Sequence, residues 1–396
     1  MVFLATVLVP LLIAACSETN IEVVDPTVDL DTDDSLPDGF VADNRPINPP
    51  TSFEMPCPWR EVPDPADNPF LVANLGPDAI QSIDQPKYVS IKEATTMLNL
   101  EDVIVCEIDG IVRAFPERIL LHHEIVNMCW DTADGPKYSY LTYCPIVRTG
   151  IHFVHPFECN KPRRNSFGVS GGLYNGNLMM FDRGSRETGP VDLFVQMYAG
   201  GVFGTCTTVD PQFTAMSWMM FKLLYPKGEV LSEDTGRAPG EGYDFFEHPY
   251  KFHWLTGDYW FPLDFDDDRL RRLEPVYGVL TPGEVRAYTI SKTNYVANEQ
   301  IGGEDIVVWN DAGLGGTAAF QAVLEGAKLT FEFLGRESHK LPLYRDEETG
   351  SIWTFDGIAV EGPLKGKRLP RATGMRSFWF AWATLYPETS LFVPGG

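Results

Sequence analysis

WMMFKLLYP at residues 218–226 returns as WFAWATLYP at residues 379–387, and this pair of segments decides the fold. Both segments begin with Trp and end in Leu-Tyr-Pro, at an offset of 161 residues, and ETG at 187–189 returns at 348–350 with the same offset. A further match, VRAF at 112–115 with VRAY at 285–288, has an offset of 173 residues. A shared offset across separate matches predicts a duplicated unit.

The residue pattern inside each copy predicts a mainly β (α+β) fold. Alternating apolar residues at 103–108 and 111–115 flank the turn dipeptide Asp109-Gly110, which is typical of a hairpin, and residues 275–279 and 285–290 form a second strand pair. Apolar spacing predicts helices over 213–224 and 378–385, and Ser90 followed by Glu93 predicts another over 91–100. We therefore expect two pseudo-symmetric, duplicated units of short strands, each closed by one helix.

These patterns also predict the domain boundaries. The first unit is expected at residues 63–235 and the second at residues 273–396. Between them, residues 236–272 are rich in aromatic and acidic residues and are expected to form a connecting loop. Residues that occur in only one copy are candidates for chemistry, whereas residues kept in both are candidates for scaffold.

The net charge restricts the class of partner. The chain of 396 residues carries a formal charge of −24. This argues against nucleic-acid binding, which needs a basic face to neutralise phosphates, and against a polybasic contact with anionic lipid. With 44% hydrophobic residues, the composition is typical of globular domains that bury a substantial core.

The N-terminal residues have the features of an export signal. Residues 1–16 are almost all apolar, are too short to span a bilayer and end in IAAC at 13–16, which resembles the lipobox of bacterial lipoproteins; no Lys or Arg precedes the apolar run. Residues 17–62 are acidic, which predicts a disordered tether. We expect an exported protein whose partner is the membrane, anchored at the bacterial cell envelope, in the outer membrane or periplasm, by a lipid on Cys16.

A series of short motifs follows in a fixed order: DQPKYVS at 84–90, VRAFP at 112–116, HEIVN at 123–127, TYCP at 142–145, FGVSG at 167–171, FDR at 181–183, TGSIW at 349–353 and FWFAW at 378–382. In this order the chain resembles the bacterial domain-of-unknown-function family 3179, from about residue 78 to the end. The resemblance implies no established activity. The family usually has a second Cys three positions after the first, where this chain has Val147, so a two-cysteine role is not expected.

Three chemically versatile residues occur in the first copy only. His123 and Glu124 correspond to apolar residues at the 173-residue offset, and Cys144 corresponds to Asp311 at an offset of 167 residues. Imidazole, carboxylate and thiolate together are suitable ligands for copper, zinc or iron. A Cys–His pair also suits nucleophilic or thiol redox chemistry. The leading hypothesis is therefore a metal-binding or thiol-based site in the first unit, with Cys144 as the candidate catalytic residue.

The alternative for Cys144 is a structural role. Cysteines of exported proteins are usually bridged, so Cys144 could pair with Cys129 or Cys159, or pack in the core. Six cysteines remain after Cys16, and the sequence leaves their pairing open.

Two other functions remain open. The first is a non-catalytic surface module that binds a ligand in the cleft between the units, where the aromatic residues Trp218, Phe221, Trp379 and Trp382 would form either core or a ligand groove. The second is a serine hydrolase, because Ser170 lies in a G-x-S-x-G pattern. That motif requires a strand, a sharp turn and a helix, whereas the residues that follow Ser170 predict another strand.

Overall fold

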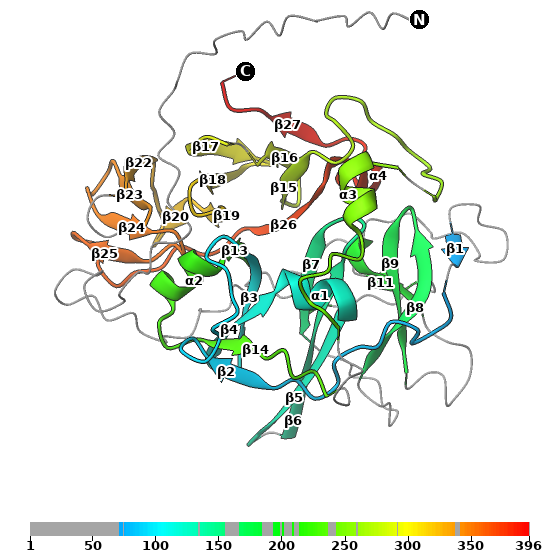
Figure 1. The fold of residues 1–396 in the computed structure, drawn as a ribbon. Helices are drawn as coiled ribbons and strands as arrows, with labels where there is room; N and C mark the ends of the chain where they lie inside the picture. Colours follow the sequence, from blue (N-terminus) through cyan, green and yellow to red (C-terminus); the bar gives the residue numbers. More distant parts are fainter. Residues whose placement is uncertain are drawn as a thin grey trace, which may run out of the picture.

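The computed structural model describes residues 71–395, apart from 74, 134, 155–165, 184–192, 199, 202–207, 210–213, 237–242, 259, 291 and 337–340. The predicted signal peptide with Cys16, the tether, the ETG at 187–189 and the cysteines at 57, 159 and 206 lie outside these residues. Over the described part the chain is mainly β-strand, as predicted (Figure 1). The helices there are α1 (Glu117–His123), α2 (Trp218–Leu224), α3 (Lys251–Thr256), α4 (Trp379–Leu385) and the 3-10 helix η2 (Gln196–Tyr198).

The largest sheet takes strands from both halves of the sequence. In spatial order they are β17 (Tyr295–Ile301), β18 (Glu304–Asp311), β19 (Gly316–Gln321), β13 (Thr214–Ser217), β3 (Asp102–Ile108), β4 (Ile111–Pro116), β14 (Glu229–Leu231) and β2 (Tyr88–Ser90). β3 and β4 form the predicted antiparallel hairpin. The halves join where Met216 of β13 pairs with Gly316 of β19. One continuous sheet therefore links the first half to the second.

A second sheet has the same strand arrangement as the part of the first sheet formed by β13, β3, β4 and β14. Its strands in order are β26 (Thr373–Phe378), β15 (Pro275–Leu280), β16 (Val285–Thr289) and β27 (Ser390–Phe392). In both sets the first strand (β13 or β26) pairs antiparallel with one strand of a hairpin (β3–β4 or β15–β16). A short strand (β14 or β27) pairs parallel with the other strand of that hairpin. α2 directly follows β13, and α4 directly follows β26.

Both helices begin with the same pair of backbone bonds. The amides of Trp218 and Met219 donate to the carbonyls of Glu101 and Asn99, at 2.8 and 2.9 Å. The first two amides of α4 donate in the same way to carbonyls just before β15, at 2.8 and 3.0 Å. Because the first amides of a helix have no acceptor within it, these bonds fix where each helix begins.

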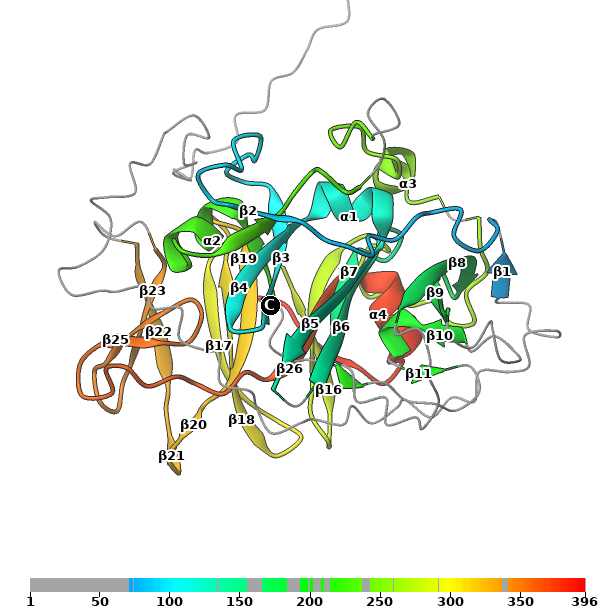
Figure 2. The same ribbon diagram turned by 90° about the horizontal axis from the view of Figure 1, so that it is seen from below.

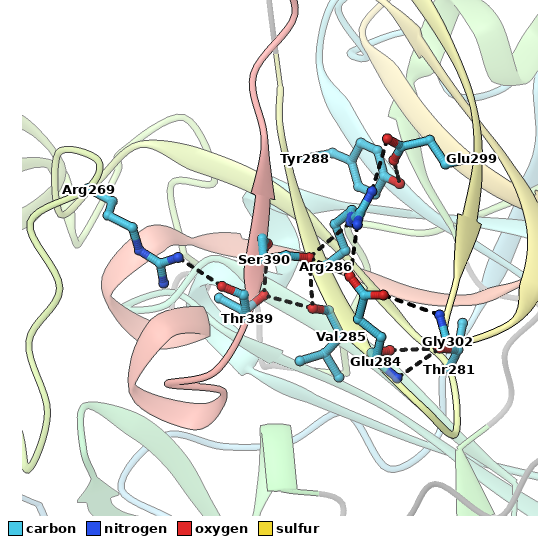
Figure 3. Close-up of polar contacts among 10 residues, drawn as sticks. All are labelled: Arg269, Thr281, Glu284, Val285, Arg286, Tyr288, Glu299, Gly302, Thr389 and Ser390. Atoms are coloured by element: carbon cyan, nitrogen blue, oxygen red, sulfur yellow. Dashed lines mark hydrogen bonds and ion pairs between the residues drawn. The ribbon is translucent and has the colours of Figure 1, made fainter. Parts of the chain in front are cut away.

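The arginine of the repeated Val-Arg-Ala motif contacts the parallel strand in both sheets. Arg286 donates to Ser390 Oγ at 2.9 Å and forms an ion pair with Glu299 at 2.9 Å (Figure 3). In the first sheet, Arg113 Nε lies 2.8 Å from Glu229 Oε2. This repeated residue therefore stabilises the scaffold.

The remaining sheets lie around these two, and Figures 1 and 2 show β22–β25 on the opposite side of the molecule from β8–β11. One contains β12 (Thr208–Val209), β7 (Thr149–Val154), β6 (Gly135–Cys144) and β5 (Ile125–Thr132). Another contains β1 (Leu71–Ala73), β8 (Phe167–Tyr174), β9 (Asn177–Asp182), β10 (Leu193–Val195) and β11 (Gly200–Gly201). A further sheet contains β22 (Phe331–Gly335), β23 (Leu343–Asp346), β24 (Ile352–Thr354) and β25 (Ala359–Glu361). A two-stranded sheet is formed by β20 (Val323–Leu324) and β21 (Ala327–Lys328).

The aromatic residues of the repeated helices belong to the core. Trp218 is 2% exposed, and Phe221, Trp379 and Trp382 are fully buried. Trp218 stacks on Phe221 with ring centroids 5.4 Å apart. The hypothesis that these side chains line a ligand groove is therefore wrong.

The helix predicted over 91–100 does not form, although its start signal does. The Ser90 amide and Oγ both donate to Glu93 Oε2, at 2.9 and 2.7 Å. Residues 91–100 nevertheless form a series of turns, and Leu98 and Leu100 are exposed. Most helical stability in proteins comes from packing an apolar face, and here Ile91, Ala94 and Met97 pack against the core from turns while Leu98 and Leu100 remain in solvent.

Three further helical features differ from the prediction. Residues 214–217 form β13, so the helix expected from 213 begins at Trp218, where Ser217 Oγ accepts from the Met220 amide at 3.2 Å. α1 was not predicted, and the first half therefore contains two α-helices. The connecting segment, expected to be loop, contains α3.

The packing of α4 on β15 gives a testable consequence. A Cβ atom at Gly278 would overlap the Trp382 ring, which is fully buried. We expect Gly278→Ala to lower the free energy of unfolding by about 1–3 kcal/mol, the usual cost of overpacking a core. Gly76→Ala is the matched control, because an added Cβ there meets nothing within 4 Å. Equal midpoints of urea denaturation for the two variants would contradict this packing.

Candidate functional site

The thiol of Cys144 lies in the core and not at a surface. Cys144 is the last residue of β6, and the turn at residues 145–148 leads into β7. The residue is 1% exposed, and the Leu178 amide donates to its Sγ at 3.3 Å. The thiol donates to the Gly176 carbonyl at 3.9 Å. The side chain therefore contacts backbone groups of the turn that leads into β9.

Burial controls the ionisation of this thiol. Burial, helped by the nearby Glu124 carboxylate, raises the pKa of Cys144 to about 12 against the opposing effect of nearby backbone amides. Reactive cysteines have lowered pKa values and sit in partly exposed, electropositive surroundings. Cys144 is therefore a neutral thiol at physiological pH, and its surroundings do not favour a nucleophile.

Glu124 lies beside Cys144 as a buried carboxyl group. The residue ends α1 in the left-handed region at φ 59°, where its amide donates to the Leu120 carbonyl at 2.8 Å. Its Oε1 accepts from the Tyr250 hydroxyl at 2.6 Å. Burial raises the pKa of Glu124 to about 7, and the bond from Tyr250 acts in the opposite direction. The carboxyl group therefore changes its charge near neutral pH.

His123 is buried between backbone and aromatic rings. Its Nδ1 lies 2.7 Å from the Gln81 carbonyl oxygen, so Nδ1 carries the proton in the tautomer that this bond requires. The ring packs edge-on against Tyr243 with centroids 5.2 Å apart. Tyr243 and Tyr250 both come from the connecting segment, which therefore covers the region of His123 and Glu124.

The predicted metal site gains no support from this geometry. No group of three or more His, Cys, Asp or Glu side chains among the described residues is arranged to hold a metal ion. His123, Glu124 and Cys144 are all buried in one region, but Glu124 is engaged by Tyr250 and Cys144 by backbone groups. The three-ligand site stays a prediction.

The turn after Cys144 is held by three donors from two distant segments, α3 and β26. The Trp254 Nε1 donates to the Pro145 carbonyl at 2.8 Å, and His253 Nε2 lies 3.1 Å from the Ile146 carbonyl. The Phe378 amide, just before α4, donates to the Val147 carbonyl at 2.9 Å. α3 and β26 thus fix this turn between the halves of the chain.

Arg148, at the end of this turn, belongs to a charge network in which Asp102 connects the halves. Its guanidinium group binds Asp102 at 2.7 Å and Glu117 at 3.2 Å. Asp102 also receives Arg376 of β26 at 2.9 Å. Burial alone would raise the pKa of Asp102, but the two guanidinium groups outweigh it and hold that pKa below its ordinary value. The network joins β3, the turn after Cys144 and β26.

A second turn stands at the corresponding place in the other half. Asp311 is the last residue of β18 and pairs with Gly316, as Cys144 ends β6 and pairs with Thr149. The amide of Ser217, just before α2, donates to the Gly315 carbonyl at 2.9 Å. Each turn is therefore bonded to the residue that precedes the repeated helix of the other half.

Asp311 is buried and incompletely bonded. It is 1% exposed, and its Oδ1 accepts from the Leu314 amide at 2.7 Å and from Arg336. Its Oδ2 has no hydrogen-bond partner in the described part of the chain. A buried carboxylate oxygen without a donor costs about 1–3 kcal/mol or more. The Nε of Arg336, whose Nη2 binds Asp311, is likewise without a partner in the described part of the chain.

Asp311 lines a pocket of about 230 Å³ built by both halves of the chain. Asp102 and Ala215 come from the first half, and Tyr277, Lys292 and Arg376 are among the residues from the second. The Nε of Arg376 has no hydrogen-bond partner among the described residues. The full lining is Asp102, Ala215, Tyr277, Ile290, Lys292, Asp311, Ala312, Gly315, Gly316, Thr317 and Arg376.

The sequence comparison aligned Asp311 with Cys144 and placed its hypothesis on Cys144, and both residues are buried in the structure. A Cys in a motif suggests chemistry, whereas an Asp after a strand is common in turns. One signal for the role of Asp311 was Gly313, which has no side chain at the place where the Arg336 guanidinium group lies.

The other sequence candidates have structural roles. Cys144 and Cys129 are not bridged: Cys144 is buried, and Cys129 is exposed on β5. Ser170 Oγ donates to the Met179 carbonyl at 2.6 Å. Ser170 lies inside β8, which a tight turn connects to β9, so the strand, turn and helix of a hydrolase nucleophile are not formed at this place. The geometry does not support a serine hydrolase.

Comparison with known families agrees with the motif order. The family model described as protein of unknown function, DUF3179, matches residues 77–389. The chain belongs to this family. Searches for similar curated proteins and for similar solved structures found no match. Among the described residues, every helix is too short or too polar to cross a bilayer. The matched range includes both turns and the whole pocket between the halves.

The burial of Cys144 predicts its reactivity. We expect iodoacetamide to modify Cys129 in the native, reduced protein, and to modify Cys144 more than about a hundredfold more slowly, because access to a core side chain requires opening of the fold. Peptide mass spectrometry after timed labelling measures both rates. In urea the two cysteines should react alike, which serves as the control. Similar rates in the native protein would contradict the buried thiol.

The buried carboxyl group predicts a pH dependence of stability. Because the pKa of Glu124 is raised from 4.5 to about 7 in the folded protein, its contribution is fully present below pH 4.5 and is lost as the pH rises through about 7. The shift corresponds to about 3 kcal/mol. We therefore expect the unfolding free energy of the wild-type protein, compared with that of Glu124→Gln, to fall by up to about 3 kcal/mol between pH 5 and pH 8. Urea denaturation at the two pH values measures this difference.

Glu247→Gln is the control for this measurement, because Glu247 is an exposed carboxylate in the same connecting segment that covers Glu124. The difference in unfolding free energy between Glu247→Gln and wild type should be the same at the two pH values. A constant difference between wild type and Glu124→Gln across the same range would contradict the raised pKa.

Proposed function

We propose that this protein binds a small ligand in the pocket between its two halves. The observation that carries the proposal is the pocket itself, which is lined by charged and apolar side chains from both halves of the chain. Ligand pockets in proteins occur preferentially at the interfaces between structural units. The hypothesis of a non-catalytic module with a cleft between units thus gains support over the thiol site.

The size of the pocket restricts the ligand. Pockets for drug-sized molecules usually measure about 300–1,000 Å³. At about 230 Å³, this pocket suits a smaller molecule. The lining combines the charged residues Asp102, Lys292 and Arg376 with the apolar residues Ala215, Ile290 and Ala312, so it suits a small ligand that has both a polar and an apolar part.

The surrounding contacts support a preformed site. Arg376 is held against Asp102, and Asp102 is held by Arg148 from the clamped turn after Cys144. Asp311 is held by Arg336 and by the Leu314 amide. Side chains that are already fixed lose little conformational entropy when a ligand binds. The motif around Cys144 would then act indirectly, because its turn positions Arg148.

We also propose that the two halves arose by duplication. The common strand arrangement, the matching bonds at the starts of α2 and α4 and the two corresponding turns support this origin. An alignment of many family members in which the segments at 218–226 and 379–387 do not resemble each other would argue against a duplication. Export and attachment of a lipid at Cys16 remain proposals, and loss of palmitate incorporation in Cys16→Ser would test the lipid.

Blocking the pocket tests the proposed function. Ala312 is half-buried and lines the pocket, so Ala312→Phe should fill part of its volume. We expect one or more members of a panel of small carboxylates, amino acids and sugars to raise the melting temperature of wild-type protein. A ligand at about a hundred times its Kd adds about 2.7 kcal/mol of stability.

Ala312→Phe should abolish this shift, whereas Ala327→Phe, on the exposed hairpin of β20 and β21, should retain it. The proposal fails if no compound in the panel stabilises the protein, or if both variants respond like wild type.

A further inference from the structure

Three large apolar side chains are exposed on and beside α3 in the connecting segment. Phe252 and Leu255, which are neighbours on one face of the helix, are 71% and 75% exposed. Trp260 follows the helix, is 49% exposed, and lies against His253 of α3 with ring centroids 5.5 Å apart. Figure 2 shows α3 at the periphery of the molecule. We call Phe252, Leu255 and Trp260 the apolar tip, because apolar side chains that are exposed as a group mark a contact surface.

The helix that carries the apolar tip is fixed to the body of the protein by its other face. His253 Nε2 lies 3.1 Å from the Ile146 carbonyl oxygen. Trp254 Nε1 donates to the Pro145 carbonyl at 2.8 Å. Gly257 ends the helix in the left-handed region at φ 69°, and its amide donates to the His253 carbonyl. The tip is therefore presented on a preformed support, so that binding through it costs little backbone entropy.

The N-terminal part of the chain enters the described structure close to the apolar tip. Leu71, the first residue of β1, pairs with Tyr174 at the end of β8. In the turn that follows, Asn175 Oδ1 accepts from the amide of Asp264, which lies in the loop that continues from Trp260. Figures 1 and 2 show β1 and α3 on the same side of the molecule. The tether predicted at residues 17–62 therefore leads to the side of the molecule that carries the tip.

The charge of the protein decides which kind of surface the apolar tip fits. The chain carries a formal charge of −24, and near the tip the exposed Lys251 is offset by the exposed acidic residues Glu247 and Asp258. Attraction to anionic lipid needs a cluster of basic side chains. A second copy of the chain would bring the same negative charge and be repelled. Contact through the tip thus depends on burial of apolar area, and an electrically neutral lipid surface suits it best.

We propose that the apolar tip inserts into the interface of an electrically neutral lipid membrane. Trp side chains favour the level of the lipid headgroups, and Phe and Leu on one face of a helix bury themselves at the boundary of the acyl chains. This inference goes beyond the proposed ligand pocket. The predicted lipid on Cys16 would anchor the chain in the same membrane and raise the local concentration of the tip there, so that a weak contact suffices.

The first test is flotation of residues 17–396 with phosphatidylcholine vesicles. These residues retain every described element of the fold and exclude the apolar segment 1–16, which would itself bind lipid. We expect wild-type protein to float with the vesicles, and Phe252→Gln combined with Leu255→Gln to lower the partition coefficient about tenfold or more, since each side chain loses its apolar burial.

The matched control is Leu98→Gln combined with Leu100→Gln. These leucines are 63% and 49% exposed and lie in the turns after β2, outside the connecting segment. The control should float like wild type. All four substituted side chains are exposed, so both double variants should fold, and equal melting temperatures without lipid check this.

The second test measures the depth of Trp260 in full-length protein reconstituted into phosphatidylcholine vesicles. Lipids brominated in the acyl chains quench the fluorescence of a tryptophan that reaches them. We expect quenching in wild-type protein and a smaller quenched fraction in Trp260→Phe. Equal quenching in the two proteins would overturn insertion of Trp260.

Three outcomes of the flotation experiment overturn the proposal. One is that residues 17–396 do not float with phosphatidylcholine vesicles, and another is that the Phe252 and Leu255 double variant floats as well as wild type. The third is binding that appears only with equal parts of phosphatidylcholine and phosphatidylglycerol and disappears at about 0.5 M salt, because screening of that kind identifies an electrostatic contact. Apolar insertion into neutral vesicles is expected to persist at this salt concentration.

Discussion

The ion pairs that Asp102 makes with Arg148 and Arg376 are the contact on which the rest of the structure depends. Asp102 belongs to the first half, Arg376 to the second, and Arg148 to the turn that follows Cys144. The three side chains are partly buried, and removing one of them leaves a charge without its partner, which is destabilising. These ion pairs therefore help to fix the position of the two halves relative to each other. The shape of the pocket depends on that position, because both halves line it.

The two turns are related to the repeated helices in a reciprocal way. The first turn accepts a backbone bond from the residue before α4, and the second turn accepts one from the residue before α2. Both turns end with a left-handed residue, Arg148 at φ 55° and Gly315 at φ 64°. In one turn the left-handed position carries a long side chain that holds Asp102, which in turn binds Arg376 of the second half, and in the other it is a glycine that lines the pocket. The same backbone geometry thus supports a closed contact on one side and a pocket on the other.

Much of the framework was predictable because it depends on local patterns. Alternating apolar residues gave the hairpins, and the repeated Trp to Leu-Tyr-Pro segments gave α2 and α4 within a few residues. The helix over 91–100 failed because its cap is local but its stability would require packing that Leu98 and Leu100 do not make. The site was less predictable. Burial of Cys144, and the missing donor at Asp311, are properties of segments that are distant in sequence, so no local pattern records them.

The single backbone pairing between β13 and β19 has a consequence for how the chain folds. During synthesis or transport, residues 102–217 are available about a hundred residues before residue 316 can complete the sheet. Until then the outer edge of β13 has no neighbour, and an exposed strand edge is a template for pairing with other chains. Completion of the large sheet therefore depends on a contact between segments far apart in the sequence, and such contacts form more slowly than local ones. A chain truncated between β13 and β19 would leave this edge of β13 uncovered.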